Sequence, residues 1–136
     1  MKRSIAALFL LSCLTGCVSS EMMATGGTTY PPRPKDYLIE VYGTTDAPVQ
    51  VLQEIGPIKS PADLPYGAMQ IGRIDSHGAP LASWGAVLES GKESARALGG
   101  DGLVLKSWAS PLAAVDQYGG TMYAKELSMT VVRYQP

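Results

Sequence analysis

The sequence contains few of the residue types that most often carry redox, metal or acid–base chemistry. Its 136 residues include two cysteines, Cys13 and Cys17, and one histidine, His77. Metal sites usually need three or four ligands from His, Cys or carboxylates, so His77 beside Asp75 does not make a metal motif. A Ser-His-Asp triad would have to use His77 as its base, and no G-x-S-x-G sequence accompanies it. The sequence therefore predicts no catalytic residues, no metal site and no enzymatic activity.

An excess of positive charge is also missing. Eleven Lys and Arg residues face twelve Asp and Glu residues, for a formal net charge of −1. Proteins that bind nucleic acid use basic patches to neutralise phosphates, so no nucleic-acid partner is expected. The glycine-rich segment 98–104 (LGGDGLV) follows a predicted helix, whereas loops that bind phosphate precede one and present its N-terminus. We therefore expect no nucleotide site there.

Only one long apolar run occurs, and it lies at the N-terminus. Ile5–Leu14 contains about ten residues without a charge, whereas a membrane-spanning helix needs about 20. Lys2 and Arg3 precede it, which is the layout of a signal peptide. Residues 1–16 are therefore predicted to be a signal peptide rather than part of the folded domain.

The end of this run resembles the lipobox of bacterial lipoproteins. Leu14 and the small residues Thr15 and Gly16 precede Cys17, and small residues let the backbone enter a signal-peptidase groove in extended form. The resemblance implies that the chain is cut after residues 1–16. It also implies that the thiol of Cys17 carries a covalent lipid, the only attached group we expect.

Lipidation would constrain the mature chain. Loss of the leader removes Cys13, so no disulfide could form, and leaves nine basic against twelve acidic residues. A chain with a net charge of −3 is not drawn to an anionic membrane, so the acyl chains would have to hold it there. By resemblance to Gram-negative lipoproteins, Val18, in place of an aspartate, favours the inner leaflet of the outer membrane, facing the periplasm.

Residues 17–36 are rich in Ser, Thr, Gly and Pro and are predicted to form the lipidated N-terminus and a flexible linker. Fully extended, the linker would span about 60 Å. The two adjacent prolines of YPPRP favour a polyproline II conformation. We interpret this motif as a stiff spacer, with a docking motif as the alternative.

Residues 37–136 are predicted to form one globular α+β domain with the order β-β-α-β-β, in which one main helix packs on a small antiparallel or mixed sheet. The helix is expected from Pro80 to Leu98, where apolar residues recur at three- and four-residue steps, and Gly99 and Gly100 should end it. The Pro- and Gly-rich segment 59–80 is predicted to be a long loop with a short strand at 69–74. The four strands are expected at 37–42, 49–55, 103–108 and 121–134.

Aromatic residues suggest both a core and a surface. Trp84 lies on the predicted apolar face of the helix and is expected in the core, whereas Trp108 at a strand end fits core packing and a binding groove equally well. Aromatic rings with polar tips often line contact surfaces. The candidate interaction surface consists of Tyr66, His77, Trp108 and Tyr118.

Two segments, SARALGGDGLVLKSW and YAKELSMTVVRY, resemble the small cell-envelope lipoprotein domains related to RcsF and to the YbjQ-like fold. The matching positions are Val51, Leu52, Glu54 and Ile55 in an early strand, Ala95, Leu98, Gly99, Asp101, Leu103 and Val104 at the helix-to-strand corner, and Val131, Val132 and Tyr134 in the last strand. The resemblance implies a fold and an envelope setting but no catalytic residues. RcsF-like domains carry disulfides that this domain lacks, and Gly100 and Gly102 stand where alanines are usual.

These observations predict a non-enzymatic, outer-membrane-anchored lipoprotein. Its periplasmic domain would bind an envelope protein partner, in sensing or in assembly. Two alternatives stay open at this point. One is a small-ligand or metal-binding module that uses the loop at 60–80, and the other is a homo-oligomeric structural module.

Overall fold

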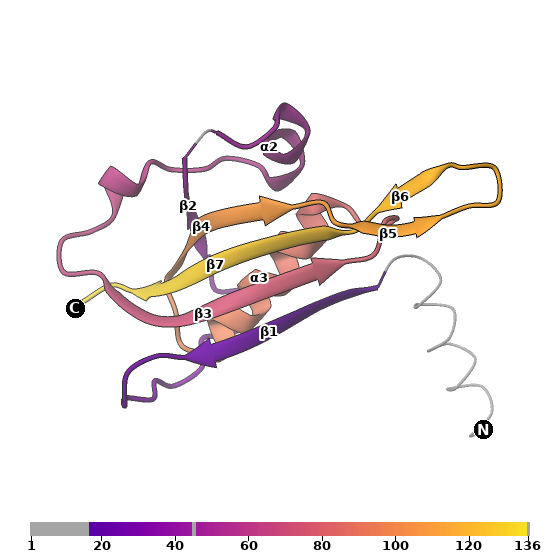
Figure 1. Ribbon diagram of the computed structural model, residues 1–136. Helices are drawn as coiled ribbons and strands as arrows, with labels where there is room; N and C mark the ends of the chain where they lie inside the picture. The colour runs from indigo at the N-terminus through magenta and orange to yellow at the C-terminus, as the bar shows by residue number, and fades with distance from the viewer. Residues whose placement is uncertain (1–16, 45, 136) are drawn as a thin grey trace, which may run out of the picture.

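A mixed five-stranded sheet organises the part of the chain that the computed structural model describes, residues 17–44 and 46–135 (Figure 1). The predicted signal peptide, with Leu14, Thr15 and Gly16, lies outside these residues. The sheet has the strand order β1-β3-β7-β4-β2, and β5 and β6 form a separate hairpin. The elements are β1 (Val18–Ala24), β2 (Glu40–Tyr42), α2 (Val49–Ile55), the 3-10 helix η1 (Pro61–Asp63), β3 (Met69–Gly78), α3 (Trp84–Ala97), β4 (Gly102–Ala109), β5 (Leu112–Val115), β6 (Thr121–Tyr123) and β7 (Lys125–Arg133).

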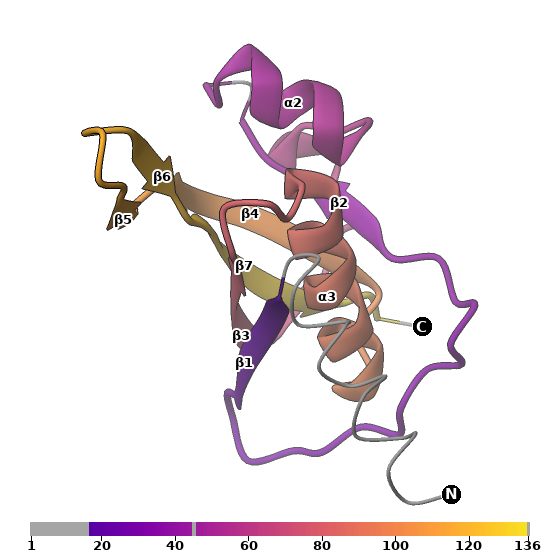
Figure 2. The same ribbon diagram turned by 90° about the vertical axis from the view of Figure 1, so that its right-hand side faces the viewer.

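Helix α3 covers one face of the sheet, here called the inner face (Figure 2). The helix begins at Trp84 rather than at Pro80, because the Ser83 side chain accepts a hydrogen bond from the Ala86 N–H and caps it. It ends at Ala97, and Gly99, two residues later, has a φ of 81°, so the predicted end before the glycine pair is confirmed. Trp84 is buried, so its predicted place in the core is confirmed.

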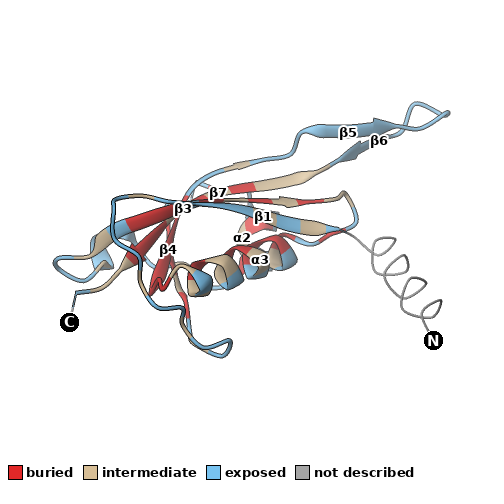
Figure 3. Cartoon of the chain, turned by 90° about the horizontal axis from the view of Figure 1, so that it is seen from below, coloured by how far each residue is buried: buried red, intermediate tan, exposed pale blue. Residues whose placement is uncertain are grey.

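The main core lies between α3 and the inner face, where the buried residues in Figure 3 gather. On the helix, Val87, Leu88 and Ala95 are buried, and they belong to one cluster with the buried sheet residues. The sheet contributes Ile74, Leu103, Leu127, Met129 and Val131 to this cluster, among others. The α+β class and a main helix packed on a sheet are thereby confirmed.

A second, smaller core covers one end of the outer face. Tyr42, Val104 and Val132 are buried there, with Leu64 and Tyr134 packed against them. The hydroxyls of Tyr42 and Tyr134 lie 2.6 Å apart. Burial, together with this hydrogen bond, raises the pKa of the Tyr134 phenol above its ordinary value. Because the cluster closes only the end of the face near the start of β3, the outer face at the other end stays open.

The prediction of a flexible linker over residues 17–36 is wrong for β1. Val18–Ala24 pairs antiparallel with β3 over its whole length. Its inward side is anchored by Ser20, whose hydroxyl lies 2.7 Å from the hydroxyls of both Ser76 on β3 and Ser90 on α3. The strand carries little sequence signal, because only Val18 among its residues packs against the main core and its chief partner is the backbone edge of β3.

The linker prediction also fails for residues 30–36, which together with Tyr37 form a proline-rich strap, residues 30–37, along the C-terminal end of α3. The Arg33 N–H donates to the Arg96 carbonyl at 2.7 Å, and Arg96 Nε donates to the Tyr37 carbonyl at 2.7 Å. The guanidinium of Arg133 stacks over the Tyr30 ring at 4.5 Å. These contacts fix the strap to the domain.

Asp101, in the turn between α3 and β4, anchors the strap from inside. Only 4 % of this residue is exposed. Its carboxylate pairs with Arg33 at 2.9 Å, accepts a short hydrogen bond from the Tyr37 hydroxyl, and accepts the Tyr134 N–H at 2.8 Å. The hydrogen bond to Asp101, together with burial, raises the pKa of the Tyr37 phenol.

Helix α2 replaces the strand predicted at 49–55. Val51 and Ile55 are buried, and residues four apart lie on one face of a helix as well as on one face of a strand. The spacing alone is therefore compatible with a helix and with a strand, and tertiary packing selects the helix. Glu54 strengthens the helical solution, because its carboxylate accepts the Trp84 N–H at 2.9 Å at the N-terminus of α3. The matched positions of the early family strand thus lie on a helix.

Strand β3 replaces most of the loop predicted at 59–80. It runs for ten residues through the interior of the sheet, between β1 and β7. A bulge between Gln70 and Gly72 puts Ile71 and Ile74, three residues apart, into the same core. This shift breaks the alternation by which a strand is recognised. The chain order thus differs from β-β-α-β-β.

The last two strands were predicted with partial success. Strands β4 and β7 lie close to the bounds expected at 103–108 and 121–134. The segment before β7 folds back instead as the β5–β6 hairpin, although its first strand was expected to be a loop. Ala124 separates β6 from β7.

Gly100 provides a test of the packing at the helix-to-strand corner. A Cβ there would lie 2.4 Å from Val131 Cγ1, so we expect Gly100→Ala to destabilise the domain by about 1–3 kcal/mol. Chemical denaturation measures the effect. Gly27→Ala is the matched control, since nothing lies within 4 Å of its Cβ and its effect should stay within about 0.5 kcal/mol. Equal effects of the two variants would contradict this account.

Asp101→Asn tests the anchoring of the strap. The amide keeps the shape of the carboxylate but removes the charge that pairs with Arg33, so we expect a loss of about 2–4 kcal/mol in the free energy of unfolding. Asp75→Asn removes a carboxylate from an exposed ion pair with Arg73 and should cost less than about 1 kcal/mol. A loss at Asp101 no larger than that at Asp75 would show that the strap is not held in this way.

Candidate functional site

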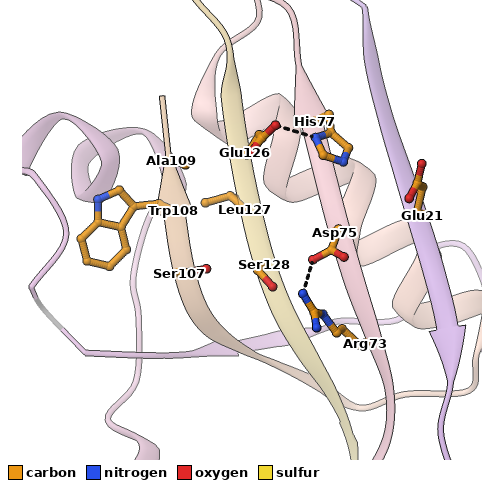
Figure 4. Close-up of a pocket in the computed structure, with 10 residues that line it drawn as sticks. All are labelled: Glu21, Arg73, Asp75, His77, Ser107, Trp108, Ala109, Glu126, Leu127 and Ser128. Atoms are coloured by element: carbon orange, nitrogen blue, oxygen red, sulfur yellow. Dashed lines mark hydrogen bonds and ion pairs between the residues drawn. The ribbon is translucent and has the colours of Figure 1, made fainter. Parts of the chain in front are cut away.

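A polar groove of about 400 Å³ lies on the open part of the outer sheet face (Figure 4). We call it the sheet-face groove. Side chains or backbone of strands β1, β3, β4 and β7 form its walls and floor. Its lining residues are Glu21, Arg73, Asp75, His77, Ser107, Trp108, Ala109, Glu126, Leu127 and Ser128.

The alternation of β3 places three charged or titratable side chains in the groove. Arg73, Asp75 and His77 are two residues apart, so they point to the same face of the sheet, while the residues between them are buried. The register sets His77 opposite Glu126 of β7 and Asp75 opposite Glu21 of β1. The predicted exposed loop containing Asp75 and His77 is therefore a strand, with both side chains on its outer face.

Two weak polar pairs line the groove, His77–Glu126 between β3 and β7 and Arg73–Asp75 along β3. Nδ1 of His77 lies 3.3 Å from Oε1 of Glu126, and the Arg73 guanidinium lies 3.4 Å from Oδ1 of Asp75. All four side chains are at least 38 % exposed, so each pair contributes only about 0–1 kcal/mol. Such pairs cost little to open, and their charges are available to a partner.

The groove carries more negative than positive charge. It contains the carboxylates of Glu21, Asp75 and Glu126 and the guanidinium of Arg73, which give a net charge of −2 when His77 is neutral. Pockets for small organic ligands are mostly apolar and enclosed, whereas this surface is charged and shallow. Its chemistry suits a basic segment of a protein lying across the strands.

Among the described residues, 17–44 and 46–135, no group of three His, Cys, Asp or Glu side chains is placed to hold a metal ion. In the groove, His77 and Glu126 contact each other directly, and Asp75 lies opposite Glu21 in the strand register.

The structure brings together two of the four residues predicted to form one interaction surface. His77 lines the groove, and Trp108 lies at its edge. Trp108 is opposite the buried Leu127 in the β4–β7 register and packs partly buried against the main core. Its ring points away from β7 in Figure 4, so core packing accounts for most of its contacts.

Tyr66 and Tyr118 lie apart from the groove, at opposite ends of the sheet. Tyr66 is fully exposed in the segment before β3, next to the end of β7, whereas Tyr118 is exposed in the turn between β5 and β6. The two segments lie at the two far ends of Figure 1. The four predicted residues do not form one continuous surface.

Sequence reasoning missed Glu21, Arg73 and Glu126. Their signal is the alternation Arg73-Asp75-His77, which becomes visible only when residues 69–78 are taken as a strand. Glu21 carries no such signal, because β1 is recognisable only from its pairing with β3.

No protein-family model and no curated protein matches the sequence. Among solved structures, the chain is similar to the crystal structure of FvfA, a virulence factor of Francisella. The TM-score is 0.53, at 11 % sequence identity, over 87 % of this chain and all of that one. At this identity the likeness shows a shared fold, and the resemblance to RcsF-like and YbjQ-like domains stays a prediction.

Proposed function

We propose that this chain is a non-enzymatic lipoprotein, anchored through Cys17 in the inner leaflet of the outer membrane, whose periplasmic domain binds an envelope protein. The sheet-face groove is proposed as the binding surface, and a basic segment of the partner as its ligand. The observation that carries the interaction role is the open, charged half of the outer sheet face. It is accessible, whereas α3 covers the inner face and the cluster of Tyr42, Val104 and Val132 covers the other end of the outer face.

The position of Cys17 supports the anchor. Cys17 is exposed, and its carbonyl accepts the Ala79 N–H at 2.8 Å, so its backbone is already part of the domain. Val18, the next residue, begins β1. A lipid on the exposed thiol would leave the core undisturbed and would hold the domain at the membrane. No helix in the described ranges is long and apolar enough to cross a bilayer.

A relation to the RcsF-like and YbjQ-like domains is part of this proposal. It is supported by the corner between α3 and β4, where Ala95, Gly99 and Asp101 have defined structural roles. The chain differs from these domains at Gly100, where an alanine is usual. The Val131 side chain gives a physical reason for this difference, because it occupies the space that an alanine Cβ at Gly100 would need.

Lipidation is tested by expressing the full chain in a Gram-negative host with an alkyne fatty acid. We expect labelling and a mass that corresponds to a cut before Cys17 and addition of a diacylglyceryl group. Cys17→Ser should abolish both, because the alkylated thiol is gone. Cys13→Ser is the matched control and should label like the wild type. Labelling that survives Cys17→Ser would rule out the proposed anchor.

The groove is tested in the same cells, once lipidation is established, with a photo-crosslinking amino acid at Ser128. We expect a discrete protein adduct there and none from the exposed Glu89 of α3. Glu126→Lys should lower the yield about tenfold, because a basic partner would meet a like charge, and Glu126→Gln should have an intermediate effect. A yield that is equal at both positions, or unchanged by Glu126→Lys, would contradict this binding surface.

A further inference from the structure

The β5–β6 hairpin extends beyond the main sheet and is exposed throughout (Figures 1 and 3). Every residue from 109 to 123 is exposed. A two-stranded hairpin that packs on nothing is at best marginally stable in water. This hairpin nevertheless carries five large exposed apolar or aromatic side chains, namely Leu112, Val115, Tyr118, Met122 and Tyr123. Such a cluster indicates contact with another apolar phase or surface.

The hairpin lies at the end of the sheet where the chain enters the domain. Val18 pairs with Gly78, and Gly78 pairs with Lys125, which begins β7 directly after the hairpin. Two strand spacings, about 10 Å, therefore separate the backbone at Val18 from that at Lys125. Ala79, hydrogen-bonded to the Cys17 carbonyl, continues this edge.

The apolar surface continues from the hairpin toward Cys17. Pro80 and Leu81, which follow Ala79, line a second groove together with Met122 and Tyr123 of β6. Leu81 is 72 % exposed and adds to the hairpin cluster. The exposed apolar side chains and the attachment point of the N-terminal segment thus share one end of the molecule.

The hairpin has the chemistry of a membrane interface. Asp116 is the one charged residue between Ser110 and Ala124, and its carboxylate is occupied by the N–H groups of Tyr118 and Gly120 at 2.8 and 2.7 Å. Tyrosine rings favour the headgroup layer of a bilayer, where the ring is apolar and the hydroxyl stays wet.

From this geometry we propose that the β5–β6 hairpin inserts its apolar side chains into the bilayer surface beside Cys17. This inference rests on the proposed lipid anchor, which would hold this end of the sheet at the membrane. The hairpin supplies a second contact, so the domain stands on the membrane with its strands pointing away from it. A single lipid attachment would leave the domain free to turn, and a second apolar contact restricts it.

The test compares two tyrosines at opposite ends of the sheet. The lipidated full chain, carrying either Tyr118→Trp or Tyr66→Trp, is reconstituted into vesicles of phosphatidylethanolamine and phosphatidylglycerol with brominated acyl chains. Both positions are exposed, and the background from Trp84 and Trp108 is the same. We expect blue-shifted emission and bromine quenching for Tyr118→Trp and neither for Tyr66→Trp. Adding Val115→Asp to Tyr118→Trp should abolish the quenching, because a charge would have to enter the interface.

The outcomes separate this inference from the lipid anchor. A chain whose mass shows the diacylglyceryl group, and which binds vesicles without quenching at position 118, overturns the hairpin contact and leaves the anchor intact. Equal quenching at positions 118 and 66 also overturns it, since the domain would then lie in no fixed orientation. If Tyr118→Trp is not quenched and Val115→Asp changes the size of the detergent-solubilised protein, the hairpin contacts protein instead. A chain without the lipid mass refutes the anchor, and with it the premise of the inference.

Discussion

The buried carboxylate of Asp101 is the interaction on which the arrangement of the chain depends. Burying a charge is costly unless it is paired and hydrogen-bonded, and Asp101 gains partners from segments far apart in sequence. Arg33 and Tyr37 come from the strap, and the Tyr134 N–H comes from the residue after β7. Its backbone joins the same junction, since its carbonyl accepts the Glu40 N–H at the start of β2. Asp101 thus fastens the strap and the C-terminal segment through its side chain, and the edge strand β2 through its backbone, to the end of α3.

Because the strap is fixed to the domain, this N-terminal segment is part of the fold rather than a free tether. A free segment between residues 17 and 36 would let the domain lie far from the proposed anchor at Cys17, at a distance of about 60 Å when fully extended. Instead, β1 adds an edge strand to the sheet, and the strap returns along the end of α3 to β2. The prolines still give a stiff path, but this path lies against the domain. The largest distance between Cys17 and any other part of the domain is therefore set by the length of the domain, not by a linker.

Sequence patterns predicted those parts of the fold in which local signals and packing agree. Helix α3 has an apolar stripe, a serine cap and a terminal glycine, and β4 and β7 are rich in β-branched and apolar residues. The failures have physical causes. Strand β1 depends on a partner far away in sequence. In α2, the four-residue spacing of Val51 and Ile55 fits both a helix and a strand, and the bulge between Gln70 and Gly72 hides the alternation of β3. The prediction of a loop in place of β3 also affected the predicted site. His77 can be grouped with Arg73 and Glu126 only when β3 is recognised as a strand.

The groove lies close to the proposed anchor at Cys17, and this proximity would restrict the kind of partner that fits. The His77–Glu126 pair lies one register position from Gly78 and Lys125, and these residues adjoin the edge at which Cys17 enters. At about 3.4 Å per residue, the groove begins within roughly 10 Å of that edge. If the anchor and the hairpin hold this edge at the bilayer, the acidic groove faces sideways, just above the headgroups. A partner that reaches it must present its basic segment close to the membrane surface, as the segment flanking a membrane-embedded part of a protein does. A domain held far out in the periplasm by a short connection would not meet this requirement.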